Sequence, residues 1–250
     1  MTGSLSDITY MQEMNTSICK ETVIDESKLL IDQRDGKSYW VTKLADKNCW
    51  MTQNLALDLY GADNFTNQNT DITVEKWEEA KGVQSMLWTT GSGIDYNLIA
   101  WYASPTNQDI GHASYGNYYS WQAATAGTGS KVATYPGNAS GSICPKGWRL
   151  PSSNSTTDNG SFGKLTTIYN IGSNAAGFSR IQTYPLYFVP GGFVNVGKLD
   201  NVSTYGFYWS STASDASHAY ALNFNSNNAG PSTNYFRYHG MFVRCLVLGS

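Results

Sequence analysis

The sequence predicts an α+β protein with a small antiparallel sheet, two short helices and long loops. Four segments between residues 184 and 248 have the composition of strands, while the helical patterns are few and short. Aromatic residues make up 14% of the chain, as much as the charged residues, also 14%. Large rings bury much area at low entropy cost, so this composition favours a loop-rich fold whose irregular segments are anchored by aromatic side chains.

The first expected element is a β-hairpin over residues 31–44. Asp35 and Gly36 form a two-residue turn between two alternating segments, which is a strong hairpin signature. Residues 1–30 are polar and show no pattern, so we expect an N-terminal lead-in that packs on the body. No linker or internal repeat divides residues 31–250, and we predict a single domain there.

The middle of the chain predicts long loops and the two short helices. Residues 60–117 place isolated aromatics among Gly, Asn, Asp, Thr and Ser, which is typical of ordered loops, with a short helix over 73–81. An amphipathic helix is expected over 119–124 and a second helix over 162–171. The expected apolar face of the second helix consists of Leu165, Ile168 and Tyr169.

The C-terminal part of the chain is expected to be β. A rigid turn and a brief strand at residues 144–151 precede four strands, at 184–189, 206–211, 218–225 and 235–248. In the third of these, apolar residues at 220, 222 and 224 alternate with residues 221, 223 and 225. One face of that strand should therefore be buried and the other exposed.

The four cysteines predict two disulfides. An even number of cysteines in a chain rich in Asn, Ser and Tyr favours an oxidising compartment, and hence an extracellular or cell-surface protein. Of the three pairings, we expect Cys19–Cys49 and Cys144–Cys245; four buried free thiols are the alternative. No C-x-x-C pair is present, so a zinc site is not predicted.

Charge and motifs exclude several function classes. The net charge of −3 gives no electrostatic footprint for nucleic acid, and no run of about 18 apolar residues predicts a transmembrane segment. Neither a G-x-S-x-G motif nor a phosphate-binding loop occurs, so we expect neither an enzyme nor a cofactor. Loops 63–71 and 154–159 carry Asp and Asn oxygens that could bind a structural calcium ion.

Several short motifs, in order along the chain, resemble those of the Fibrobacter succinogenes major paralogous domain. The motifs are Asp35-Gly36 with Tyr39, CWMTQNL at residues 49–55, CPKGWRLP at 144–151, YWSST at 208–212, Ala219-Tyr220 and GMFVRC at 240–245. The resemblance covers nearly the whole chain after residue 30. It implies a C-type lectin fold of the formylglycine-generating-enzyme type.

The resemblance also implies a function. Proteins of this branch include the variable proteins of diversity-generating retroelements, in which adenine-directed mutagenesis rewrites selected codons near the C-terminus. The fold displays the altered side chains as a ligand-binding surface, and the partner would be a protein or glycan on another cell or virus. Two alternatives stay open: an invariant structural module of a cell-surface protein, and a formylglycine-generating-like oxidase with a reactive cysteine pair.

The composition of residues 214–239 agrees with such a surface. This stretch contains five Asn, four Ser, three Tyr and two His, which are residue types of adaptable binding sites, although an ordinary surface loop is also rich in Asn and Ser. The candidate ligand-binding residues are Tyr205, Phe207, Asp215, Ser217, His218, Asn223, Asn225, Asn227, Asn228, Asn234, Tyr235, Tyr238 and His239.

The remaining large side chains are expected to be structural. Core positions are predicted for Trp50, Trp101, Trp121, Trp148 and Trp209. Arg244 is expected to bind an internal carbonyl or carboxylate and not a ligand. The sequence lacks the Glu-Pro-Asn, Gln-Pro-Asp and Trp-Asn-Asp signatures of calcium-dependent sugar sites, so that mode of binding is not predicted.

Overall fold

The computed structural model describes residues 3–57, 66, 70, 102–103, 115–129, 138–153, 160–195 and 198–249. Within these residues the protein is mixed α/β, with small antiparallel sheets and few helices. A four-stranded sheet has the order β1 (Ser27–Ile31), β2 (Ser38–Lys43), β3 (Cys49–Met51) and β11 (Leu246–Val247). A three-stranded sheet has the order β10 (Asn228–Phe236), β9 (His218–Asn225) and β8 (Gly206–Ala213).

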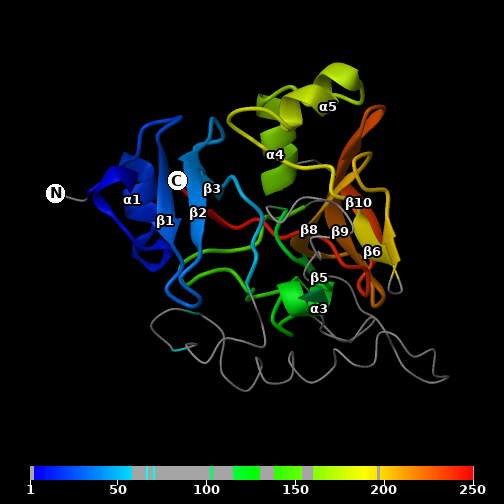
Figure 1. Ribbon diagram of the computed structural model, residues 1–250, viewed down its shortest axis with the longest axis horizontal. Coiled ribbons are helices and arrows are strands. Elements are labelled where there is room, and N and C mark those ends of the chain that lie inside the picture. Colours follow the sequence, from blue (N-terminus) through cyan, green and yellow to red (C-terminus); the bar gives the residue numbers. More distant parts are fainter. Residues whose placement is uncertain are drawn as a thin grey trace.

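Short ladders and helices surround these two sheets. The ladders pair β4 (Tyr102–Ala103) with β5 (Tyr118–Tyr119), and β6 (Phe193–Asn195) with β7 (Lys198–Asp200). The described helices are the 3-10 helices η1 (Leu5–Asp7) and η2 (Met11–Glu13), and the α-helices α1 (Thr16–Glu21), α3 (Trp121–Ala124), α4 (Ser161–Ile168) and α5 (Ala175–Ile181). Figure 1 shows α1 on the outer side of β1, and the three-stranded sheet at the opposite end of the molecule.

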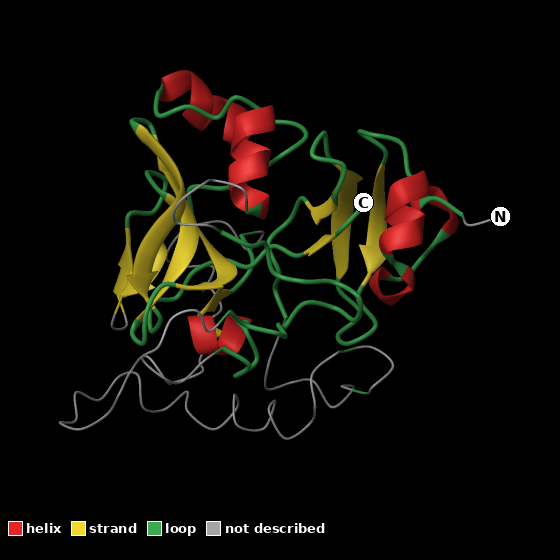
Figure 2. Cartoon of the chain, turned by 180° about the vertical axis from the view of Figure 1, so that it is seen from behind, coloured by secondary structure: helices red, strands yellow, loops and turns green. Residues whose placement is uncertain are grey.

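Residues 3–30 form regular elements, although the sequence shows no pattern there. They form η1, η2, α1 and most of β1, and they bury Leu5, Met11, Met14 and Cys19 completely or nearly so. Each short helix buries a single apolar side chain, so no 3.6-residue period builds up in the sequence. The view from behind shows these helices against the same sheet (Figure 2).

The first hairpin forms where predicted, but its turn is longer. Ile31 pairs with Ser38, so six residues connect the strands instead of two. The reason is Arg34, which is 1% exposed and forms an ion pair of 2.6 Å with the buried Asp32. Arg34 Nη1 also donates to the carbonyl of Ile143 at 2.6 Å, and the longer turn folds inward to make that bond.

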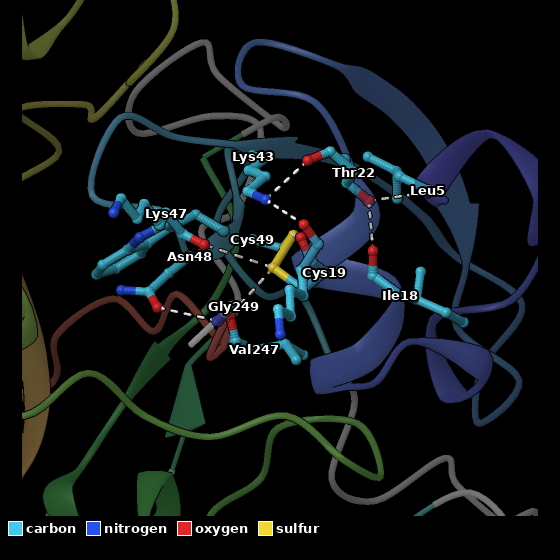
Figure 3. Close-up of a disulfide and its surroundings, with 12 residues drawn as sticks. Leu5, Ile18, Cys19, Thr22, Lys43, Lys47, Asn48, Cys49, Val247 and Gly249 are labelled. Carbon is cyan, nitrogen blue, oxygen red and sulfur yellow. Dashed lines mark hydrogen bonds between the residues drawn. A yellow bond between two sulfur atoms is a disulfide. The ribbon is translucent and has the colours of Figure 1, made fainter. Parts of the chain in front are cut away.

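Both predicted disulfides are present. Cys19–Cys49 joins α1 to β3, and Cys144–Cys245 joins the turn at residues 144–151 to the C-terminal segment. Beside the first disulfide, the buried Lys43 donates from Nζ to the carbonyl of Thr22 at 2.7 Å (Figure 3). A cation at the end of α1 also suits the helix dipole.

Residues 240–247 connect the two sheets. All eight are buried, and they form bridges in turn with β6, β5 and β8, and then the ladder of β11 with β3. The strand predicted over 235–248 is therefore split: its first residues end β10, and its last form β11. The residues between β10 and β11 pair with several different elements, so no single regular ladder forms over 235–248.

Core packing corrects the prediction that β9 exposes one face. Leu222 and Phe224 lie in one hydrophobic cluster, while Ala219 and Ala221 lie in another on the opposite face. Asn223 is only 3% exposed. Because β9 is the central strand between two cores, both of its faces are covered.

The other helices and strands follow the predictions in part. α3 forms, but all four of its residues are buried, so it is not amphipathic. α4 buries Phe162 and Leu165 but leaves Ile168 49% exposed, so the predicted apolar face is right at Leu165 and wrong at Ile168. Residues 184–189 form no strand, and α5 was not predicted.

Four of the expected core tryptophans are buried, and each indole N–H donates a hydrogen bond: Trp50, Trp121, Trp148 and Trp209. Trp101, the predicted helix 73–81 and the loop 154–159 lie outside the described residues, as does the loop 63–71 except for residues 66 and 70. Of the helices that the structure describes, none is long and apolar enough to cross a membrane.

Removal of each disulfide should destabilise the protein according to its loop length. The chain separations are 101 residues for Cys144–Cys245 and 30 for Cys19–Cys49. Loop-closure entropy then predicts losses of about 4.7 and about 3.6 kcal/mol in the free energy of unfolding when each pair is replaced by alanine. Urea unfolding followed by tryptophan fluorescence measures both. An equal or larger loss for the shorter loop contradicts this explanation.

Candidate ligand-binding surface on the C-terminal strands

The edge strand β10 is accessible along its whole length. It pairs only with β9 in the three-stranded sheet, and none of its nine residues is buried. In β8 and β9 most residues are buried. A register shift between Gly230 and Thr233 interrupts the pairing of β10 with β9, as a β-bulge does. The strand thus presents side chains from both of its faces, instead of every second one.

Beyond β10, aromatic rings gather around His239. Its imidazole centroid lies 4.7 Å from the ring of Tyr238, 5.0 Å from Phe193, 5.8 Å from Phe236 and 6.3 Å from Tyr235. His239 itself is only 8% exposed, and its Nδ1 has no hydrogen-bond partner within the described part of the chain. Burial lowers the pKa of His239 to about 4, and the nearby His218 adds to the effect. The ring is therefore neutral at neutral pH.

Two arms extend from this centre. In one, Phe236 lies between His218 at 4.2 Å and Tyr238 at 5.2 Å. In the other, Phe207 contacts Tyr235 at 5.3 Å and Tyr205 at 5.8 Å. We call the connected rings the C-terminal aromatic cluster: Phe193, Tyr205, Phe207, His218, Tyr235, Phe236, Tyr238 and His239.

The cluster brings together six of the candidate ligand-binding residues, but two of them are its buried base. Phe207 is 2% exposed and His239 is 8% exposed, so neither is open to a ligand as expected. Phe207 is buried because it belongs to the hydrophobic core next to β6. Partly accessible members of the predicted set are Tyr205, His218, Tyr235 and Tyr238.

Arg237 fixes the end of β10 to its surroundings. Its guanidinium lies 4.3 Å above the ring of Trp121, and its Nε donates to the carbonyl of His218 at 3.2 Å. Nη2 donates to the carbonyl of Asp215, and the backbone N–H of Trp121 donates to the carbonyl of Arg237 at 2.9 Å. The accessible rings are therefore carried on a fixed backbone.

Asp215 and Ser217 form the turn before β9. Asp215 Oδ1 accepts from the backbone N–H groups of Ser217 at 2.8 Å and His218 at 2.7 Å. Burial opposes ionisation of Asp215, but hydrogen bonds from His218 and Ser217 outweigh it and lower the pKa of Asp215 to about 2. Asp215 is exposed, but its carboxylate also holds the turn together, so the residue has a structural role.

The Asn residues of the candidate set lie elsewhere. Asn225 Oδ1 accepts from the backbone N–H groups of Asn227 at 2.7 Å and Asn228 at 2.9 Å, which makes the turn between β9 and β10. This turn is at the opposite end of β9 from His218, about 23 Å away for a strand of this length. Asn223 is buried and donates to the carbonyl of Gly206 at 3.4 Å, so its predicted exposure is wrong.

The predicted set is thus divided between the two ends of the sheet. His218, Asn234, Tyr235, Phe236 and Tyr238 lie toward one end, Asn227 and Asn228 lie at the other, and Phe207 pairs with Asn223 near that second end. Sequence reasoning missed Phe236, which is 41% exposed at the centre of one arm of the cluster. Its position two residues after Asn234, on the same face of an exposed strand, is the signal that could have identified it.

No protein-family model, curated protein or solved structure matches the chain. Among the residues that the structure describes, no group of three or more His, Cys, Asp or Glu side chains could hold a metal ion.

The buried imidazole of His239 should make stability depend on pH. Its pKa falls from the ordinary 6.5 to about 4 on folding. Between these two pH values the unfolded chain therefore binds a proton at His239 and the folded protein does not. The free energy of unfolding should therefore decrease as the pH falls through this window. His239→Phe keeps the ring contacts and should remove this decrease, with stability at neutral pH unchanged or slightly higher because an unpartnered nitrogen is lost.

Urea unfolding of both proteins near neutral pH and near the middle of this window measures the effect. Asp215 does not interfere, because its stabilising contribution is lost only between 3.8 and about 2. The explanation is wrong if both proteins lose the same free energy on acidification.

Proposed function

We propose that this is an extracellular ligand-binding protein whose recognition surface is formed by β10 and the C-terminal aromatic cluster. The observation that carries the proposal is the contrast between β10, accessible at all nine positions, and β8 and β9, which are packed between two cores. A rigid frame that carries accessible, exchangeable side chains is what a binding surface needs.

In its finer form, the proposal is a variable protein of a diversity-generating retroelement, built on a C-type lectin fold of the formylglycine-generating-enzyme type. The resemblance to the Fibrobacter succinogenes major paralogous domain is its basis. Support comes from where the motifs lie: residues 49–52, 208–210 and 240–245 are all buried. The positions kept for the proposed surface are exposed or partly accessible, so replacing them should disturb the frame less than replacing the buried motif residues would.

The proposed surface is smaller than the set expected from sequence. Its members are Tyr205, His218, Asn234, Tyr235, Phe236 and Tyr238, with Asn227 and Asn228 as a separate exposed pair. Tyrosine rings provide rigid contact area and asparagine amides provide adaptable hydrogen bonds, so a protein or glycan on another cell or virus is the proposed partner. The two disulfides agree with an extracellular location.

The alternatives require different observations. A formylglycine-generating-like oxidase needs reactive thiols, whereas all four cysteines are bonded, and Cys144 and Cys245 are at most 2% exposed. An invariant structural module needs no variable positions. The DNA beside the gene distinguishes this alternative from the proposal.

We expect a reverse-transcriptase gene and a template repeat close to the coding sequence for residues 205–239. The repeat should differ from that sequence only at adenines, and the differing codons should encode accessible residues such as Asn234 and Tyr238. Differences that fall equally on buried codons such as those of Leu222 and Phe224 would contradict the proposal.

Changes on the proposed surface should leave stability intact. Asn234→Tyr and Asn227→Tyr, both at exposed positions, should change the free energy of unfolding by about 0.5 kcal/mol or less. The control is Ala221→Leu, in the same hydrophobic core as Ala219, where overpacking should cost about 1–3 kcal/mol. Urea unfolding measures all three variants, and similar losses at all three positions would show that the surface is not separable from the frame.

A further inference from the structure

A cavity lies against the four-stranded sheet, at a place separate from the C-terminal aromatic cluster. Its volume is about 470 Å³, within the range of roughly 300–1,000 Å³ usual for small-molecule sites. One wall comes from β1, β2 and the residues after β3, and the other from residues 184–189. The lining residues are Ser27, Trp40, Thr42, Thr52, Gln53, Asn54, Tyr184, Tyr187, Val189 and Arg244.

The sheet wall combines one large ring with a pair of hydroxyls. Trp40 lies on the outer face of β2 and is 46% exposed. Its backbone is held on both sides, since its N–H donates to Gln53 Oε1 at 2.9 Å and its carbonyl accepts from the N–H of Thr52 at 2.9 Å. Ser27 of β1 pairs with Thr42 of β2, and their hydroxyl oxygens are 2.7 Å apart.

The opposite wall carries two tyrosine rings. Tyr184 is 56% exposed and Tyr187 is 48% exposed, and their rings meet edge to face at 6.1 Å. The hydroxyl of Tyr184 donates to the carbonyl of Asp25 at 3.5 Å, which links this wall to the chain just before β1. The buried Leu186 and Phe188 anchor the segment from behind, so both tyrosines face outward.

Arg244 holds this wall in place from the cavity floor. It is 1% exposed and stacks 4.0 Å from the ring of Phe188. Its Nε donates to Asn54 Oδ1 at 2.8 Å, Nη1 to the carbonyl of Leu186 at 2.5 Å, and Nη2 to the carbonyl of Tyr187. This contact confirms the internal role that the sequence predicted for Arg244.

The backbone of Tyr187 is strained at this point. Its φ of +49° lies in the left-handed region, which a bulky residue adopts only when its surroundings impose it. The guanidinium of Arg244, which donates to the carbonyl of Tyr187, is part of the surroundings that impose this conformation and fix the orientation of the Tyr187 ring. The rings are thus preorganised, which lowers the entropy cost of binding.

We infer that this cavity binds a neutral saccharide ring. A pyranose has an apolar face of C–H groups and an edge of hydroxyls; the first suits Trp40, Tyr184 and Tyr187, and the second suits the hydroxyls and amides of the sheet wall. Among the described residues that line the cavity none is acidic, which disfavours a cationic ligand. The guanidinium of Arg244 is buried and already donates to three acceptors of the protein, so it does not call for a carboxylate on the ligand.

The test is NMR titration of the full chain with cellotriose, chitotriose and maltotriose, together with N-acetyltryptophanamide as a non-sugar aromatic probe. The indole N–H signal of Trp40, assigned from the spectrum of Trp40→Phe, is the readout. We expect at least one of the trisaccharides to shift it saturably at millimolar concentration. Trp40→Ala and Tyr184→Ala should each weaken that binding by about tenfold or more.

Tyr10→Ala is the matched control, because Tyr10 is also a partly exposed ring, at 38%, but belongs neither to the cavity lining nor to the C-terminal aromatic cluster. It should leave saccharide affinity unchanged. Loss of binding in Trp40→Ala or Tyr184→Ala but not in Tyr10→Ala assigns the saccharide to this cavity, whatever the recognition surface binds. Tyr184→Ala carries the test by itself if Trp40→Ala does not fold. The inference is overturned if none of the trisaccharides shifts the Trp40 signal, if only the aromatic amide does, or if the folded variants bind like the wild type.

Discussion

Residues 240–247 pass through the centre of the protein, and their burial is the constraint on which the rest depends. They pair with β6, β5, β8 and β3 in succession, and Cys245 is bonded to Cys144 within the same stretch. The four-stranded sheet takes its last strand, β11, from this segment, and the three-stranded sheet is bridged to it between Tyr208 and Phe242. A shared segment lets two modest sheets and several short helices complete one another.

Buried arginines solve the problem that such a fold creates. Long irregular segments leave backbone carbonyls without ladder partners, and a buried unsatisfied carbonyl is costly. Arg34, Arg237 and Arg244 are each about 1% exposed, and each donates to two carbonyls of another segment. The planar guanidinium offers five donors in a fixed fork, which lysine cannot replace. Arg237 holds the turn before β9 and Arg244 holds the wall of residues 184–189, so these two arginines set the geometry of the two proposed binding regions.

Local patterns predicted the strand His218–Asn225, the first hairpin and both disulfides, because these depend on alternation, turn residues and cysteine count. The burial of Asn223 could not be read from its neighbours, because it results from a second core on the far face of β9. The aromatic cluster was predicted only in part for the same reason: residues 193, 205 and 239 meet through long-range packing. Trp40 follows the alternation of the hairpin, since it lies between the buried Tyr39 and Val41, but nothing local predicts the tyrosines that face it.

The position of β11 also determines when the protein can fold. Residues 240–247, which pair with β3 and form bridges to β5 and β8, follow all the other described strands in the sequence. The two cores therefore stay incomplete, and Cys144 stays unpaired, until this segment has been made. Contacts of such long sequence separation are slow to form, which exposes apolar strands in the meantime. The Cys144–Cys245 bond, which spans 101 residues of the sequence, can likewise form only once this segment is present.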